Sequence, residues 1–285
     1  MSLRIYIVIP AFNEAQFIGR TLESLTQQSL LPEKVVIVND GSTDDTELIV
    51  TEFCRKHPFI SLVQNDTEGD LHAPGSKVIK AFNEGYKHLD GDYDIICKFD
   101  SDLIFPQNYL ERIAFHFNSS AKAGMVGGFC TIEKNGNWEI ENLTGKDHIR
   151  GALKAYRKEC FEDIGKLREA MGWDTVDELL AHYHDWQVVT DENLLVRHLK
   201  PTGASYSNRS GERQGLAFYR LRYGRILTYI ASAKLAYQKK DLKLFREYIR
   251  GFHLAKKEKR PYLVSEDEGI FIRNLRWKKI FQKLF

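Results

Sequence analysis

The chain has 285 residues, of which 43% are hydrophobic and 28% are charged. This length and composition allow a sizeable buried core, and they exclude an intrinsically disordered chain. The net charge is only +2, but residues 209–285 hold 20 Lys and Arg against 7 Asp and Glu, whereas residues 1–208 hold 21 against 32. The acidic N-terminal region and the basic C-terminal region, residues 209–285, are therefore predicted to have different functions.

The sequence carries no pattern typical of a secreted or membrane-spanning protein. The first residues contain one short apolar run without the length or cleavage pattern of a signal peptide, and no apolar stretch is long enough to span a bilayer. The four cysteines are widely spaced and form no CxxC pair, which is typical of reduced thiols. We therefore expect a cytoplasmic protein.

Apolar runs alternate with helical spacing through the first hundred residues. This alternation predicts crossover units and a mainly parallel sheet. The runs are almost uniformly apolar, as expected of strands buried on both faces. Strands are predicted at 5–9, 34–39, 59–64 and 93–99, and helices at 14–28, 43–57 and 76–88.

The pattern loosens beyond residue 100. Further helices are predicted at 106–117, 147–165, 174–184 and, with a break near Lys240, 214–259; strands are predicted at 125–133, 186–190 and 193–198, with a loop at Asn135-Gly136. We expect an α/β domain over 1–208, in two halves at about 1–105 and about 106–208. Residues 209–285 are expected to form a basic, amphipathic helical region.

Polar clusters follow three of the predicted strands. They begin at Pro10 (PAFNE), at Asn39 (NDGSTD) and at Asp100 (DSD). The carboxyl ends of parallel strands share one edge of a sheet, where ligands of such folds bind. The sequence therefore predicts that the three clusters meet at one site.

Two of these clusters carry carboxylates suited to a nucleotide and a metal. Asp40 before Gly41 can point into a crevice and accept hydrogen bonds from a base or ribose; the alternative is an ordinary helix start. Asp100 and Asp102 can converge on Mg²⁺ or Mn²⁺, which prefer oxygen ligands and would neutralise a diphosphate. Taken alone, an Asp-x-Asp sequence is usually a solvated turn.

Four segments together resemble the bacterial, nucleotide-sugar-dependent family-two glycosyltransferases of GT-A fold. They are IVIPAFNEAQFIGRTLESLTQQ, VVIVNDGSTDDT, PGSK at 74–77 and FDSD at 99–102. The resemblance is strong over about 4–110 and continues weakly to about 200. It implies a central, mainly parallel sheet flanked by helices, and a UDP-sugar as donor. It also implies that the half at about 1–105 binds the donor and that the half at about 106–208 lies on the acceptor side.

The resemblance also implies roles for individual residues. Asp40 would contact the base, most often uracil in this family, and Asp100 the ribose or metal side. Asp102 would contact the metal and diphosphate. Lys77 would approach the nucleotide, and His198 could add a metal ligand, although a solvated lysine and a packed histidine are the plainer interpretations. The nucleoside pocket would be lined by Pro10, Ala11, Phe12 and Glu14.

An inverting transferase needs a base to take the proton of the acceptor hydroxyl. Family members usually supply it from a Glu-Asp pair before a helix, and this chain reads GWDTVDE at 172–178 instead. Asp174 is our first choice and Asp177 the second, the alternative being acids that stabilise the start of a helix. Trp173 could stack on a sugar or pack in the core.

The basic C-terminal region interleaves aromatic and cationic residues, as in FYRLRYGR at 218–225. It could settle on the inner face of an anionic membrane, which would suit a lipid-linked acceptor and a peripheral location. The alternative is a helical appendage packed on the catalytic domain. No nucleic-acid-binding motif accompanies the charge, so we expect no nucleic-acid partner.

We therefore expect an inverting, metal-dependent glycosyltransferase of the hexosyltransferase type. It would move a sugar to a hydroxyl of a saccharide or lipid-linked acceptor, in polysaccharide or cell-envelope synthesis. A sugar-nucleotide pyrophosphorylase would show a Gly-rich basic loop where this chain has PAFNE, and a dinucleotide oxidoreductase would show GxGxxG. The remaining alternative is a catalytically decayed scaffold that binds nucleotide or lipid.

Overall fold

A computed structural model describes residues 3–65, 76–141, 145–200 and 210–284. The chain divides into two compact units, Met1–Thr202 and Gly203–Phe285. The boundary that we expected at 208 and 209 falls among residues 201–209, which lie outside the described residues. Within the described parts, none of the helices combines the length and apolarity that a membrane crossing requires.

In the described part of the first unit, nine strands form one sheet in the order β3-β2-β1-β4-β8-β6-β9-β5, with β7 paired to β6. The strands are β1 Ile5–Ala11, β2 Lys34–Asn39, β3 Ile60–Gln64, β4 Ile95–Phe99, β5 Leu103–Ile104, β6 Ala123–Lys134, β7 Asn137–Ile140, β8 Leu153–Arg157 and β9 Gln187–His198. The helices are α1 Ile18–Thr26, α2 Thr46–Lys56, α3 Ser76–Lys87, α4 Tyr109–Ser119, α5 Lys158–Asp163 and α6 Trp173–Tyr183.

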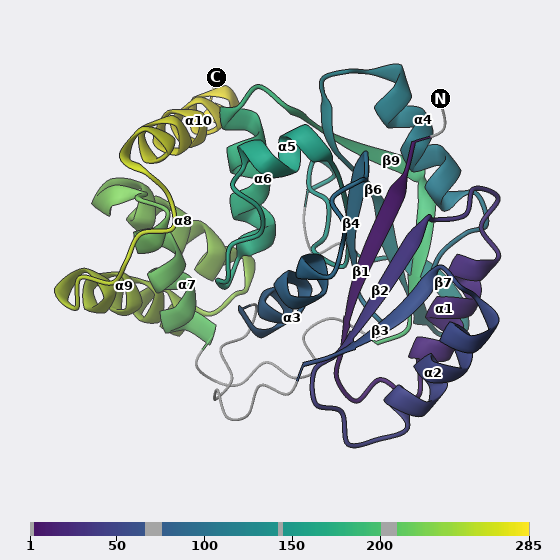
Figure 1. Cartoon of the computed structure of the whole chain (residues 1–285). Helices are drawn as coiled ribbons and strands as arrows, with labels where there is room; N and C mark the ends of the chain where they lie inside the picture. The colour runs from purple at the N-terminus through teal and green to yellow at the C-terminus, as the bar shows by residue number, and fades with distance from the viewer. Residues whose placement is uncertain (1–2, 66–75, 142–144, 201–209, 285) are drawn as a thin grey trace. The chain divides into compact units, whose positions relative to one another are not determined.

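Strands β3, β2, β1 and β4 run parallel, as the sequence predicted. Figure 1 shows α1 and α2 on one face of these strands and α3 on the other. Every side chain of β1 and β4 is therefore buried, which explains why these segments lack the alternation of a half-exposed strand. The polar residues that follow the strands emerge together at one edge.

The second half of the sheet is mixed. β8 is antiparallel to both β4 and β6, while β6 and β9 run parallel. The helix predicted at 147–165 is wrong: β8 occupies Leu153–Arg157, and only Lys158–Asp163 is helical. Its sequence LKAYR fits either structure locally, and pairing on both sides selects the strand.

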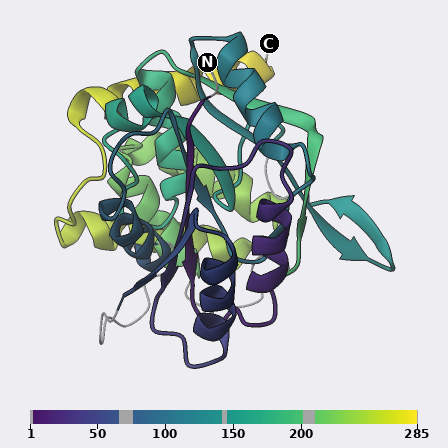
Figure 2. The same ribbon diagram turned by 45° about the vertical axis from the view of Figure 1, so that its right-hand side comes forward.

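The two short strands predicted at 186–190 and 193–198 form one strand, β9, whose pairing with β6 is irregular between Gly127 and Phe129. The loop predicted at Asn135-Gly136 is confirmed. Both residues have positive φ and connect β6 to β7, and the resulting hairpin projects from the sheet (Figure 2).

The described part of the second unit is helical. It contains α7 Ser210–Arg220, α8 Gly224–Gln238, α9 Leu242–Lys257 and α10 Glu266–Leu284. Gly215 of α7 lies so close to α9 that an added Cβ would be 2.0 Å from the Tyr248 carbonyl oxygen. The Asp241 side chain accepts a hydrogen bond from the Lys243 backbone N–H at 2.9 Å, so it caps α9 after the predicted break near Lys240.

Candidate active site

The polar clusters that follow β1, β2 and β4 line a single cavity of about 410 Å³. All eight residues expected to bind the nucleotide and diphosphate, from Pro10 to Asp102, belong to its wall. Asp174, Asp177 and His198 do not line it. The wall is made by Pro10, Ala11, Phe12, Glu14, Asp40, Lys77, Val78, Ala81, Asp100, Ser101, Asp102 and Lys200.

Hydrogen bonds between the loops after β1 and β2 fix this edge. The Asn13 backbone N–H donates to Ser42 Oγ at 3.0 Å, and the Thr43 backbone N–H donates to Asn13 Oδ1 at 2.8 Å. The Glu14 backbone N–H donates to Thr46 Oγ1 at 2.8 Å, while Asp44 Oδ1 accepts from the Thr46 backbone N–H at 3.1 Å. These side chains position the loop, which leaves Asp40 to face the cavity.

Asp40 is buried and has both carboxylate oxygens engaged. Oδ1 accepts from Asn65 Nδ2 at 2.7 Å, and Oδ2 lies 3.2 Å from Lys77 Nζ. Lys77 Nζ also lies 4.1 Å from the centre of the Phe12 ring, which is 44% exposed. Asn65 therefore fixes the carboxylate, and Phe12 offers an exposed aromatic face beside it, on which a base can stack.

Asp102 of the cavity wall forms a buried pair with His198, which lies behind the wall. His198 Nε2 lies 3.3 Å from Asp102 Oδ2, and His198 Nδ1 lies 3.4 Å from Glu141 Oε2. Glu141 in turn contacts the Arg150 guanidinium. The pairing of Leu103 in β5 with His198 in β9 brings the two side chains together.

The Asp102 and His198 pair fits a divalent cation whose remaining ligands come from substrate and water. Within the described residues, no three His, Cys, Asp or Glu side chains are grouped closely enough to hold a metal by themselves. Asp102 and His198 nevertheless present an oxygen and a nitrogen donor side by side, and Asp100 lines the same wall. Mg²⁺ and Mn²⁺ sites commonly use few protein ligands together with water and substrate phosphates.

Glu14 adds negative charge to this wall. Its Oε1 accepts from Lys200 Nζ at 2.8 Å, whereas Oε2 is buried and, among the described residues, has no hydrogen-bond partner. Burial raises the pKa of the Glu14 carboxyl; the Lys200 pair opposes this rise, and the charges of Asp102 and Asp100 reinforce it. A cation or donor group entering the cavity would relieve this unfavourable arrangement.

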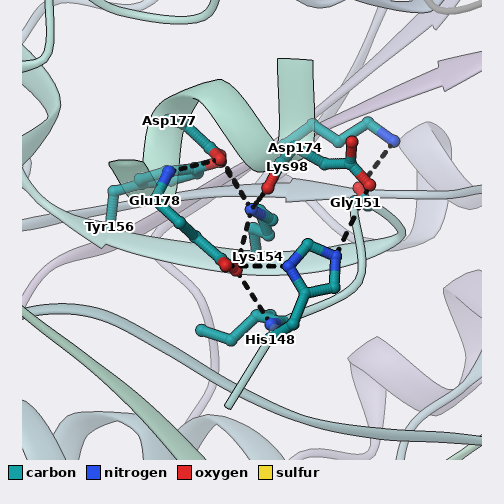
Figure 3. A network of polar contacts seen from close by, with 9 residues as sticks. Lys98, His148, Gly151, Lys154, Tyr156, Asp174, Asp177 and Glu178 are labelled. Carbon is teal, nitrogen blue, oxygen red and sulfur yellow. Dashed lines mark hydrogen bonds and ion pairs between the residues drawn. The ribbon is translucent and has the colours of Figure 1, made fainter. Parts of the chain in front are cut away.

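The two expected bases lie in different environments on α6 (Figure 3). Asp177 is 3% exposed and accepts hydrogen bonds from Lys154 Nζ at 2.8 Å and 2.9 Å and from the Tyr156 hydroxyl at 2.5 Å. Burial raises the pKa of Asp177 to about 6, although Lys154 opposes the rise. The Asp174 side chain is 34% exposed, and its carboxylate lies 3.7 Å from His148 Nε2.

Gly151 links Asp174 to the cavity. Its carbonyl accepts from Lys98 Nζ at 3.0 Å, and Lys98 contacts Asp100, which lines the cavity. A Cβ on Gly151 would lie 2.8 Å from the Trp173 ring and 3.2 Å from Asp174 Cβ. Asp174 is therefore connected to the cavity wall through Gly151, Lys98 and Asp100. The Trp173 ring is buried, near the ammonium groups of Lys98 and Lys154, and belongs to the core.

Comparison with known proteins identifies the family. The pattern described as "Glycosyl transferase family 2" matches residues 6–167, more than half of the chain. The chain belongs to this family. An uncharacterized glycosyltransferase of Haemophilus influenzae is 34% identical over 72% of this chain and 78% of its own. The probable glycosyltransferase YdaM of Bacillus subtilis is 30% identical over 62% of this chain and 44% of its own.

Solved structures agree on the GT-A fold. The S. aureus transferase TarS 1–349, in complex with UDP-GlcNAc, has a TM-score of 0.56 at 20% identity, covering 75% of this chain and 65% of its own. The mannosyltransferase PcManGT of Pyrobaculum calidifontis, with GDP-Man and Mn²⁺, has a TM-score of 0.60 at 17% identity, covering 100% of this chain and 81% of its own. This chain spans between 44% and 60% of the length of relatives such as YdaM and a Mycoplasma pneumoniae homologue.

Several residues in and around the site were not predicted from the sequence. Asn65 and Lys200 carry no local signal, because each is a single polar residue after a strand. Lys98 and Lys154 could have been noticed as lone charges inside apolar segments, and both are buried. Lys154 was hidden because its segment was predicted as a helix.

Proposed function

We propose that this family 2 glycosyltransferase moves a sugar from a UDP-sugar to a hydroxyl of a saccharide or lipid-linked acceptor. The proposal rests on the cavity in which Asp40, Asp100 and Asp102 meet after three different strands. Two structural neighbours, TarS and PcManGT, were solved with a nucleotide sugar. A poly-β-1,6-N-acetyl-D-glucosamine synthase of Staphylococcus epidermidis, 24% identical over 69% of this chain and 50% of its own, supports a saccharide acceptor.

The nucleoside would bind between Phe12 and Asp40. Phe12 would stack on the base, and Asp40, held by Asn65, would accept a hydrogen bond from it. Lys77 would exchange part of its contact with Asp40 for the nucleotide. Asp100 would contact the ribose or the metal side of the donor.

Asp102 and His198, with Asp100, would hold Mn²⁺ or Mg²⁺. The ion would supply charge stabilisation for the departing diphosphate. Lys200 lies two residues after His198 and lines the same wall, so it would add positive charge for the diphosphate when it leaves Glu14. The metal ion would then neutralise the carboxylates of the wall, and Lys200 would face the negative charge of the donor.

The transfer step would be an in-line displacement. The acceptor oxygen forms a bond to the anomeric carbon while the bond from that carbon to the UDP oxygen breaks, and the electron pair leaves with UDP. Asp174 would receive the acceptor proton, because its carboxylate is partly exposed and near the cavity wall. Asp177 serves less well as a base because Lys154 and Tyr156 occupy its oxygens. Attack opposite the leaving group inverts the anomeric configuration.

The second unit would approach an anionic membrane surface when the acceptor is lipid-linked. Its sequence holds 20 Lys and Arg against 7 Asp and Glu over residues 209–285. Basic helices with exposed apolar side chains bind such surfaces. Among the described residues of this unit, the exposed large apolar side chains are Ile226, Tyr229, Ile230, Tyr237, Leu242, Leu254, Tyr262, Ile270 and Phe281.

Titration calorimetry with UDP, with and without Mn²⁺, tests the donor site. Wild-type protein should bind UDP more tightly with Mn²⁺, and Asp102→Asn should lose most of that gain, by about tenfold or 1.4 kcal/mol. The exposed Asp45→Asn variant is the matched control and should bind as wild type does. Equal UDP affinity in wild type and Asp102→Asn would remove Asp102 from this role.

UDP release from a panel of UDP-sugars separates a transferase from a binding scaffold. Slow transfer to water should release UDP from at least one donor. Tight UDP binding without release from any donor, with or without candidate oligosaccharide acceptors, would favour the scaffold.

Sedimentation with vesicles of phosphatidylcholine, with and without phosphatidylglycerol, tests the membrane contact. Binding to neither kind of vesicle would exclude it.

A further inference from the structure

A histidine outside the cavity wall connects Asp174 to a buried carboxylate (Figure 3). His148 Nδ1 lies 2.7 Å from Glu178 Oε2, and the Ile149 backbone N–H donates to Glu178 Oε1 at 2.9 Å. The opposite ring nitrogen, Nε2, lies 3.7 Å from Asp174 Oδ2. Glu178 therefore fixes the orientation of the ring, and the ring faces the Asp174 carboxylate.

We propose that His148 is a positioning residue for the base: held by Glu178, its imidazolium orients the Asp174 carboxylate and keeps it ionised. This inference rests on the proposed role of Asp174. A contact of 3.7 Å is longer than a hydrogen bond, so it acts by charge and does not use up an oxygen lone pair. The carboxylate can therefore still accept a proton from an acceptor hydroxyl.

The buried ammonium group of Lys154 is directed elsewhere. Lys154 Nζ contacts the Asp174 carbonyl oxygen at 2.5 Å, both oxygens of Asp177 and Glu178 Oε1 at 3.2 Å. It thus fixes the backbone at the start of α6 and neutralises Asp177. His148 contributes the positive charge that points at the Asp174 side chain.

The ionisation of the cluster agrees with this arrangement. Burial lowers the pKa of His148, but Asp174 and Glu178 outweigh it and raise the pKa to about 9, so the ring is charged at neutral pH. Burial raises the pKa of Asp174, but His148 and the charge of Lys154 outweigh it, and the pKa is lowered overall. The titratable groups that act on this pair are Lys154 and Glu178. Lys154 also contacts Asp177, which accepts a hydrogen bond from Tyr156.

Carboxyl-carbon NMR titration of Asp174 measures the coupling without a substrate. His148→Asn keeps a donor near Glu178 and removes the charge, whereas His148→Gln places a neutral donor near the position of Nε2. Both variants should raise the pKa of Asp174 by about 1 unit, since an opposite charge within about 4–6 Å lowers a carboxyl pKa by 1–3 units. His184→Asn, at the exposed end of α6, is the control and should leave it unchanged.

The pH profile of UDP release from UDP-N-acetylglucosamine, with water as acceptor, gives a second readout. The acidic limb should move to higher pH in both His148 variants, and the plateau should fall by about tenfold or more. Glu178→Gln should shift the limb in the same direction. An unchanged Asp174 pKa in both folded His148 variants would overturn the inference, whether or not UDP release is detectable.

Asp174→Asn separates this inference from the proposed function. If that variant releases UDP at the wild-type rate, the base assignment fails even where the NMR coupling is present. If release is lost in Asp174→Asn but the His148 variants match wild type in pKa and pH profile, only the inference about His148 fails. Circular dichroism and Mn²⁺-dependent UDP binding verify that each variant is folded.

Discussion

Asp102 and His198 come from distant parts of the chain, and the pairing of β5 with β9 brings Oδ2 and Nε2 to 3.3 Å. Their side chains are 9% and 7% exposed, so a cation bound between them would be shielded from bulk water. Glu141 Oε2 lies 3.4 Å from the other ring nitrogen, Nδ1, and this contact orients the histidine. The strand register thus determines the donor pair.

The first prediction concerns this pair. His198→Asn and Asp102→Asn should each weaken Mn²⁺-dependent UDP binding by about tenfold. Because both side chains would hold one ion, the double variant should lose much less than the product of the two single effects. Calorimetry of the four proteins measures this, with exposed His88→Asn as control. Fully additive losses would place the two residues in separate sites.

The second prediction concerns the nucleoside. Asp40→Asn should weaken uridine and UMP binding by about tenfold. The amide can accept hydrogen bonds through its oxygen alone, and its contact with Lys77 is no longer an ion pair. The loss should persist without Mn²⁺, unlike that of Asp102→Asn. Asp45→Asn is the matched control on the same loop. Wild-type uridine affinity in Asp40→Asn would contradict the assignment.

The third prediction concerns the wall beside Asp174. Gly151→Ala should destabilise the protein by about 1–3 kcal/mol, because its Cβ would enter the space of Trp173 and Asp174. The resulting displacement of Asp174 should also slow UDP release. Thermal unfolding and UDP release give both effects, and Gly19→Ala, which meets only an ordinary contact with Ile49, should be neutral or stabilising.

The fourth prediction concerns pH and stability. The pKa of His148 is raised in the folded protein, so its contribution is complete below its unfolded pKa of about 6.5 and is lost as pH rises through about 9. The stability difference between wild type and His148→Asn should therefore be largest at pH 6, at most about 3 kcal/mol, and should shrink towards pH 10. Urea unfolding across this range measures it. A difference independent of pH would mean that His148 acts by packing alone.

Local signals were sufficient for the parallel half of the fold. Largely apolar runs followed by polar clusters predicted β1 to β4 and the shared edge, because strands inside a parallel sheet are mostly apolar and their carboxyl ends meet at one edge. Eight of the wall residues followed from this rule and the family resemblance, whereas Val78, Ala81, Ser101 and Lys200 were not predicted. The segment around Lys154 was misassigned, because its place in the sheet is stabilised by β4 and β6 on its two sides, and neither is adjacent in sequence.

The sequence by itself determined the fold class, the order of the first strands and the group of carboxylates at their ends, since each depends on residues close together in the chain. Only the tertiary structure decided that Lys200 reaches Glu14, that Lys154 neutralises Asp177, and that His148 faces Asp174. These contacts join segments that are remote in sequence, and buried charges are tolerated only where the fold supplies opposite charges at hydrogen-bond distance. A one-dimensional pattern contains no record of those distances.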